Sequence, residues 1–175
     1  MRDKLGRLAS LLICMCICIA GCARVQGENS VVTYGALSMS LPDGFQASTT
    51  KGLYLSDAYP EDLSNIYLYT EPMTEGASLE ALMSQEEARF VQNLQDAYEK
   101  QYEERPEIIV ESYEKAEVAG KEAWKVELQY SLEDVVYHQI EYVIAADQMY
   151  YVAFSALDSE AHEAAFASAI DSISF

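Results

Sequence analysis

The sequence predicts one α+β domain built on a mostly antiparallel sheet, because two hydrophobic periods divide it into distinct regions. Apolar and polar residues alternate in short runs from residue 31 to residue 70 and again from residue 107 to residue 156, as in β-strands. Between these regions apolar residues recur at three- and four-residue steps, as on one face of a helix. A shorter stripe of the same kind ends the chain. The later strands are joined by short turns, which favours a meander closed by a helix.

The first 22 residues have the layout of a secretory signal. Three basic side chains, Arg2, Lys4 and Arg7, precede the run 8–22, which has no charged side chain and ends on small residues. A membrane-spanning helix needs about 20 predominantly apolar residues, and this run is shorter than that. We therefore expect a cleaved leader in preference to an uncleaved anchor.

The motif that closes this run, Ile19-Ala20-Gly21-Cys22, resembles the lipobox of bacterial lipoproteins. The resemblance implies cleavage before Cys22 and a thioether-linked diacylglycerol on its sulfur. Two acyl chains would then hold the protein stably at the cell membrane, on the extracytoplasmic side. On this interpretation the chain has a lipoprotein signal peptide (1–21), a lipidated polar tether (22–30) and a single globular domain (31–175).

The composition after residue 21 excludes several classes of partner. Without the three basic residues and the one acidic residue of the signal, 8 Lys and Arg face 28 Asp and Glu, a formal charge of about −20. Such a surface repels nucleic acid and anionic lipid headgroups, and it keeps an exported domain soluble. A cationic ligand or partner is the more specific interpretation. All four cysteines lie at or before Cys22, so we expect neither a disulfide nor a thiolate metal site in the domain.

The N-terminal part of the domain predicts short strands. Residues 31–41 alternate as a strand pair or one bent strand, and Pro42-Asp43-Gly44 follows as a turn in which glycine takes a positive φ. Phe45 is expected to return to the core. Residues 52–56 and 66–70 are two further strands, and the polar connector between them is expected to stay at the surface.

This connector and its border form the candidate ligand surface. It consists of two tyrosines and three acids, namely Tyr54, Asp57, Tyr59, Glu61 and Asp62. Rigid aromatic rings beside carboxylates suit a cationic or saccharide ligand. The acids lack the spacing of a calcium loop, and an ordinary solvated turn is the alternative interpretation.

The helical stripe begins at Ser78. Its apolar members are Leu79, Leu82, Met83, Phe90, Val91, Leu94, Ala97, Tyr98 and Tyr102. The sequence Ser84-Gln85-Glu86-Glu87 has the form of a capping box, which predicts two helices with a break near Ser84. Pro106 is expected to stop the second helix.

The C-terminal half predicts a meander. The expected strands are 107–118, 123–131, 135–145 and 148–156, with turns at 119–121, 132–134 and 146–147. In the second strand, Trp124, Val126, Leu128 and Tyr130 share one face. The last strand is apolar on both faces and so belongs at the centre of the sheet or under cover. A final helix starts at Asp158 or Ser159, and Phe175 is expected to pack back onto the sheet.

This order of elements resembles the Mog1/PsbP-like domains. The phrases that carry the resemblance are Leu41-Pro42-Asp43-Gly44-Phe45, Gly120-Lys121-Glu122-Ala123-Trp124 and Ile170-Asp171-Ser172-Ile173-Ser174-Phe175. The resemblance covers nearly all of residues 31–175 and implies an α/β/α sandwich around a mostly antiparallel sheet, similar to many bacterial lipoproteins of unassigned role. Members are known chiefly as binding or assembly modules, in photosystem assembly and nuclear transport. No common functional residues transfer to this sequence.

The domain has no recognisable catalytic signature. It lacks a Gly-x-Ser-x-Gly elbow, a His-Glu-x-x-His motif and a phosphate-binding loop. Its two histidines have no partner at metal-ligand spacing, so we expect no metal and no cofactor. We expect His138 to be a packed core residue and His162 to pack at an edge or to pair with a nearby acid.

Two hypotheses follow. The first is a membrane-anchored, non-catalytic binding or assembly module, whose partner is an envelope protein or a small ligand. The second is a cell-envelope hydrolase that uses a pair of carboxylates, an idea that rests on the acidity alone.

Overall fold

The computed structural model describes residues 31–73, 78–132, 135–157 and 159–175. The predicted signal peptide, Cys22 and the tether lie outside these residues, as do positions 133 and 134 of the predicted turn. In the described ranges, no helix combines the length and the apolar character needed to cross a bilayer.

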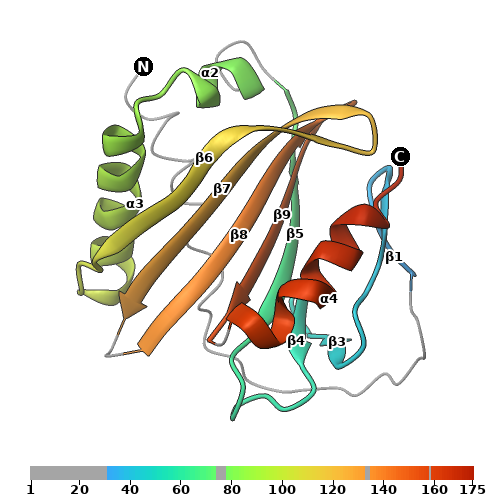
Figure 1. Ribbon diagram of the computed structural model, residues 1–175, viewed down its shortest axis with the longest axis horizontal. Coiled ribbons are helices and arrows are strands. Elements are labelled where there is room, and N and C mark those ends of the chain that lie inside the picture. Colours follow the sequence, from blue (N-terminus) through green and yellow to red (C-terminus); the bar gives the residue numbers. More distant parts are fainter. Residues whose placement is uncertain (1–30, 74–77, 133–134, 158) are drawn as a thin grey trace.

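A seven-stranded antiparallel sheet is the frame of the domain (Figure 1). The strands lie in the order β3-β4-β5-β9-β8-β7-β6, so the last four form the predicted meander. Their bounds are β3 Phe45–Ala47, β4 Leu53–Ser56, β5 Asn65–Glu71, β6 Ile108–Val118, β7 Lys121–Leu132, β8 Val135–Ala145 and β9 Met149–Ala156. A separate hairpin, β1 Val31–Tyr34 with β2 Leu37–Ser40, confirms the strand pair predicted at the start of the domain.

β9 lies at the centre of this sheet, between β5 and β8. All eight of its residues are buried. The prediction from its two apolar faces is confirmed, because a central strand under cover on both sides exposes neither face to water.

Helices cover both faces of the sheet. On one face, α2 (Leu79–Met83) and α3 (Glu87–Tyr102) pack against β7. α2 buries Leu79 and Leu82 there, and α3 buries Leu94 and Tyr98. On the other face, α4 (Ser159–Asp171) and the β1-β2 hairpin pack over β5 and β9. In Figure 1, α4 lies in front of the sheet. The domain is therefore the α/β/α sandwich that the resemblance implies.

The break between α2 and α3 falls at Ser84 as predicted, but the capping box is wrong. Ser84 ends α2, and its hydroxyl donates to the carbonyl oxygen of Ala81 at 3.0 Å. α3 has Glu86 at its N-cap, without a side-chain hydrogen bond. Ser78 caps α2 instead by accepting from the Ala81 N–H at 3.2 Å. The chain uses Gln85 and Glu86 to turn, so Ser84 is too early to cap α3.

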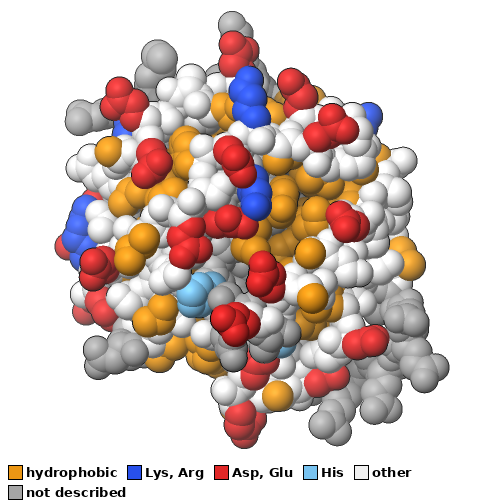
Figure 2. Space-filling view, in the orientation of Figure 1, with side chains coloured by type: hydrophobic (Ala, Val, Ile, Leu, Met, Phe, Trp, Pro, Cys, Tyr) orange, Lys and Arg blue, Asp and Glu red, His pale blue; other side chains and the backbone are white. Residues whose placement is uncertain are grey.

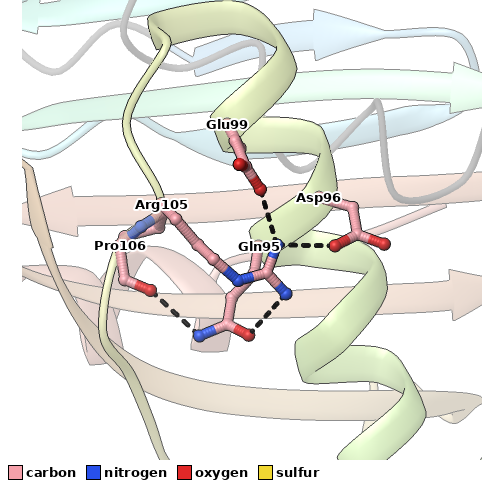
Figure 3. Close-up of polar contacts among 5 residues, drawn as sticks. All are labelled: Gln95, Asp96, Glu99, Arg105 and Pro106. Carbon is pink, nitrogen blue, oxygen red and sulfur yellow. Dashed lines mark hydrogen bonds and ion pairs between the residues drawn. The ribbon is translucent and has the colours of Figure 1, made fainter.

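A polar cluster fixes the exit from α3 (Figure 3). The helix ends before Pro106, as predicted, and Glu103 takes a left-handed φ of 59°. Arg105 then folds back onto α3, where its Nη1 lies 2.7 Å from both Asp96 Oδ1 and Glu99 Oε2. Gln95 donates to the carbonyl oxygen of Pro106 at 3.0 Å. These contacts orient the chain toward β6.

Three local features differ from the prediction or extend it. Phe45 is buried as expected, but it also begins the short strand β3, which the sequence pattern did not indicate. The predicted surface connector ends in two buried residues, Ser64 and Asn65, because β5 starts at Asn65 inside the sheet. Phe175 contacts the sheet through the ring of Tyr150, at 5.2 Å between centroids, yet 40% of its surface stays exposed.

Candidate functional site

The face of the sheet that packs against α4 is wider than α4 and the β1-β2 hairpin together. Neighbouring strands lie about 4.8 Å apart, whereas a helix with its side chains is about 10–12 Å wide, so α4 and one hairpin cannot cover seven strands. α4 packs on β9 and β2. Much of the same face of β6, β7 and β8 is left open beside it (Figure 1).

A pocket of about 240 Å³ occupies the border between α4 and this open face. Its apolar lining is Ile140, Phe154, Ala156 and Phe166, and its polar side chains are Glu111, Glu127, Gln129, His138 and Glu163. Figure 2 views the molecule from this side and shows acidic side chains spread over it, with hydrophobic and histidine surface between them. The pocket therefore combines an aromatic and aliphatic floor with a carboxylate-rich rim.

The rim carboxylates are not equivalent. Glu127 Oε1 lies 2.6 Å from Lys125 Nζ, and both side chains are partly exposed. Burial lowers the pKa of the Lys125 ammonium, but the hydrogen bond to Glu127 and the nearby charges of Glu127 and Glu114 together outweigh this effect, and the pKa is raised. Glu111 accepts a hydrogen bond from Gln129. Glu163 projects from α4 as an exposed side chain. Of the three carboxylates, Glu127 is the one that pairs with a lysine among the described residues, so the rim keeps a net negative charge.

The prediction for His138 is wrong. It does lie on the strand face predicted for it, together with Ile140, but that face is only partly covered, so His138 is half-buried and lines the pocket. Val136, on the same face, is 48% exposed. The strand period assigns a residue to a face, but it does not say how far a helix extends over that face.

His162 behaves as predicted, at an edge and beside an acid. Its Nε2 lies 3.3 Å from Asp62 Oδ2, and its ring packs against Phe45 and Phe166, each at 5.5 Å between centroids. His162 directly precedes Glu163 on α4. The contact with Asp62 therefore fixes the turn of α4 that forms one wall of the pocket.

The five residues of the predicted ligand surface are placed around the connector, and none of them lines the pocket. Tyr54 is half-buried on β4, where burial and then Tyr34 raise its pKa. Asp57 and Glu61 are exposed, and Tyr59 is partly buried. Ligand binding by these residues stays a prediction.

Asp62 differs from the other four because its carboxylate is already engaged. Burial raises its pKa, but hydrogen bonds from Ser64 and Ser56 outweigh burial and lower it. Ser64 donates from both its hydroxyl, at 2.6 Å, and its backbone N–H, at 2.9 Å. The side chain closes the connector onto α4.

Sequence reasoning did not single out the pocket acids Glu111, Glu127 and Glu163. They come from β6, β7 and α4 and are far apart in the chain, so no spacing links them. Among the described residues, no group of three or more His, Cys, Asp or Glu side chains is placed to hold a metal ion.

The strand order and the helices on both faces define an α/β/α sandwich, and this fold is similar to the PsbP-like fold. The solution structure of cyanobacterial PsbP (CyanoP) from Synechocystis sp. PCC 6803 is similar, with a TM-score of 0.62 and 13% identity over 89% of this chain and 98% of that chain. The crystal structure of LpqN, involved in cell envelope biogenesis of Mycobacterium tuberculosis, has a TM-score of 0.52 and 14% identity over 79% of this chain and 82% of that chain. No family model and no curated protein matches the chain. At these identities the similarity establishes the fold alone.

Proposed function

We propose that this protein is a lipid-anchored envelope protein whose domain is a non-catalytic binding module, and that the pocket beside α4 receives a positively charged group of its ligand or partner. The observation that carries this proposal is the carboxylate-rich rim above an aromatic floor. The LpqN similarity supports a place in the envelope, because that protein is involved in envelope biogenesis and shares the fold.

The chemistry of the pocket favours a cation with an apolar stem. Glu111, Glu127 and Glu163 attract a positive charge, and the domain's strongly acidic surface steers such a partner toward it. Phe154 and Phe166 offer apolar and π surface for the carbon chain behind that charge. A lysine or arginine side chain of a partner protein has this form, and so does a small alkylamine.

The same contacts favour binding over hydrolysis. A carboxylate pair that cleaves a glycoside needs a proton donor and a second carboxylate on opposite sides of the bond. In this pocket Glu127 is held by Lys125 and Glu111 by Gln129. Both groups are oriented by neighbours in the same sheet, which suits a fixed negative rim.

Charge reversal on the rim tests the binding site. The protein is captured from detergent-solubilised membranes after crosslinking, and co-purifying partners are compared between wild type and Glu163→Lys. We expect a partner that elutes with increasing salt and that falls at least tenfold in Glu163→Lys, because one attractive charge becomes repulsive.

Glu117→Lys is the matched control, since Glu117 is also an exposed acid and lies on β6 beside the far β6-β7 turn. It should recover the partner as wild type does. Equal recovery by Glu163→Lys, or repeated recovery of no partner by wild type, would contradict the proposed site.

Removal of the lipidation site tests the proposed anchoring at the membrane. Cys22→Ser removes the sulfur that would carry the acyl chains, so the protein is expected to leave the membrane fraction or to stay unprocessed. Membrane fractionation and metabolic labelling with a fatty acid measure both outcomes. Cys18→Ser, within the predicted signal, should remain labelled and membrane-bound. Lipid labelling that survives Cys22→Ser would disprove the lipobox interpretation.

A further inference from the structure

A row of polar side chains crosses three central strands on the face away from α4. Asn65 of β5 pairs in register with Ser155 of β9, and Ser155 pairs with Gln139 of β8. Directly opposed residues of antiparallel strands have Cβ atoms about 4.5–5.5 Å apart and project to the same side. The three side chains therefore stand next to one another, in the middle of the sheet.

These side chains are almost fully buried and incompletely bonded. Their exposed fractions are 5% for Asn65, 1% for Ser155 and 2% for Gln139. The oxygens Asn65 Oδ1, Ser155 Oγ and Gln139 Oε1 have no hydrogen-bond partner. Unsatisfied buried oxygens are costly, and native domains contain few of them.

The amide nitrogens of the row are already used. Asn65 Nδ2 donates to the carbonyl oxygen of Leu63 at 3.1 Å, and Gln139 Nε2 faces Glu141 Oε2 at 3.4 Å. Exchanging the oxygen and nitrogen of Asn65 would break its contact with Leu63, and exchanging those of Gln139 would break its contact with an ionised Glu141. What the row still offers is two amide oxygens and one hydroxyl. The single O–H of Ser155 can serve only one of the two amide oxygens, so at least one of them requires a donor or a cation from elsewhere.

Glu141 adds a carboxyl group to the same face, two positions along β8 from Gln139. It is 4% exposed. The ion pairs found in the described part of the chain use Arg105, Lys125 and His162 and do not reach it. Tyr151 and Glu71 also lie on this side, and neither provides positive charge. The carboxyl group is therefore buried without a counterion from the described residues.

We propose that Asn65, Ser155, Gln139 and Glu141 form a binding site for one small, hard cation. An amide oxygen from each of two strands, a hydroxyl and a carboxylate are the oxygen ligands that such cations prefer. Binding would satisfy the three unpaired oxygens and neutralise Glu141 in a single step. The site has one carboxylate and three neutral oxygens, so it differs from the acidic rim on the other face.

Thermal unfolding of the full-length protein in detergent tests this site. Chelator-treated protein is melted with added Ca²⁺, Mg²⁺ or Na⁺ at constant ionic strength, and stoichiometry is measured by titration calorimetry. We expect one of the cations to raise Tm saturably, with one ion per chain. The rise should disappear in Glu141→Gln, and the affinity should fall at least tenfold in Ser155→Ala.

Because Glu141→Gln changes Tm by itself, the quantity compared is the shift that the cation produces in each variant. Glu117→Gln, which removes an exposed carboxylate, should keep the full shift. No saturable shift in wild type would mean that ordered water satisfies the row, and would overturn the proposal. A shift that persists in Glu141→Gln would assign the binding to surface carboxylates and would overturn it as well.

Discussion

Gly52→Ala is expected to destabilise the domain by about 3 kcal/mol or more, a large fraction of the stability of a domain of this size. Gly52 has a φ of +82°, and a Cβ built there would collide with the backbone carbonyl oxygen of Leu68. That carbonyl belongs to β5, in the sheet, and cannot move away as a flexible side chain could. The Leu68 N–H also donates to the Gly52 oxygen at 2.8 Å, so the two backbones must stay close.

Gly44→Ala is the matched control for this prediction. Gly44 has nearly the same φ, +84°, but nothing lies within 4 Å of a Cβ there. Its replacement should cost only the conformational penalty of a left-handed alanine, about 1–2 kcal/mol. Urea unfolding of both variants measures the difference. Equal losses would show that backbone conformation, and not the close approach to β5, determines the cost.

Glu141→Gln is expected to stabilise the domain at neutral and alkaline pH, in the absence of added cations. Burial raises the pKa of Glu141 from 4.5 to about 8, against a smaller opposing effect of the Gln139 hydrogen bond. The folded protein therefore binds a proton that the unfolded chain has lost over this interval. The contribution of Glu141 to the stability of wild type is therefore most favourable below pH 4.5. It becomes less favourable as the pH rises to about 8.

The variant removes this pH dependence because glutamine does not ionise. At pH 8 the difference in unfolding free energy should be on the order of 4 kcal/mol in favour of Glu141→Gln, and at pH 5 it should be under about 1 kcal/mol. Chemical denaturation at both pH values measures it. A constant difference across the range would show that Glu141 does not titrate in this interval.

Much of the fold follows from local patterns. The alternation of Trp124, Val126, Leu128 and Tyr130 placed them on one face of β7, and all four are buried, on the face that α3 covers. The two apolar faces of β9 predicted its central place. Both inferences use the pattern of apolar and polar residues along a single strand. This pattern can be seen in the sequence of that strand alone.

The candidate pocket could not be predicted in this way. Glu127 follows the same alternation as its neighbours and reads as an ordinary polar position on an exposed face. It lines a pocket because α4 covers β9 but does not extend over β7. Phe166 and Glu163, on α4 near the C-terminus, form the opposite wall of that pocket. How much of the sheet α4 covers depends on the width of the helix and on where it packs. The sequence of a single strand does not contain this information.

The buried row was hidden for a similar reason. Asn65 closes a polar connector and was expected at the surface, while Ser155 and Gln139 are single polar residues within apolar strands. Strand register brings the three together, and that register depends on the order β5-β9-β8. Their chemistry is visible only after the pairing is known.

The sequence by itself determined the kind of domain, the positions of its main strands and helices, its strongly negative charge and the expectation of a lipid on Cys22. These properties depend on composition, on local hydrophobic period or on a short contiguous motif. The tertiary structure alone decided which acids surround the pocket beside α4, how far His138 is exposed and which buried polar side chains become neighbours across β5, β9 and β8. These properties depend on distances between segments far apart in the chain, and packing sets those distances.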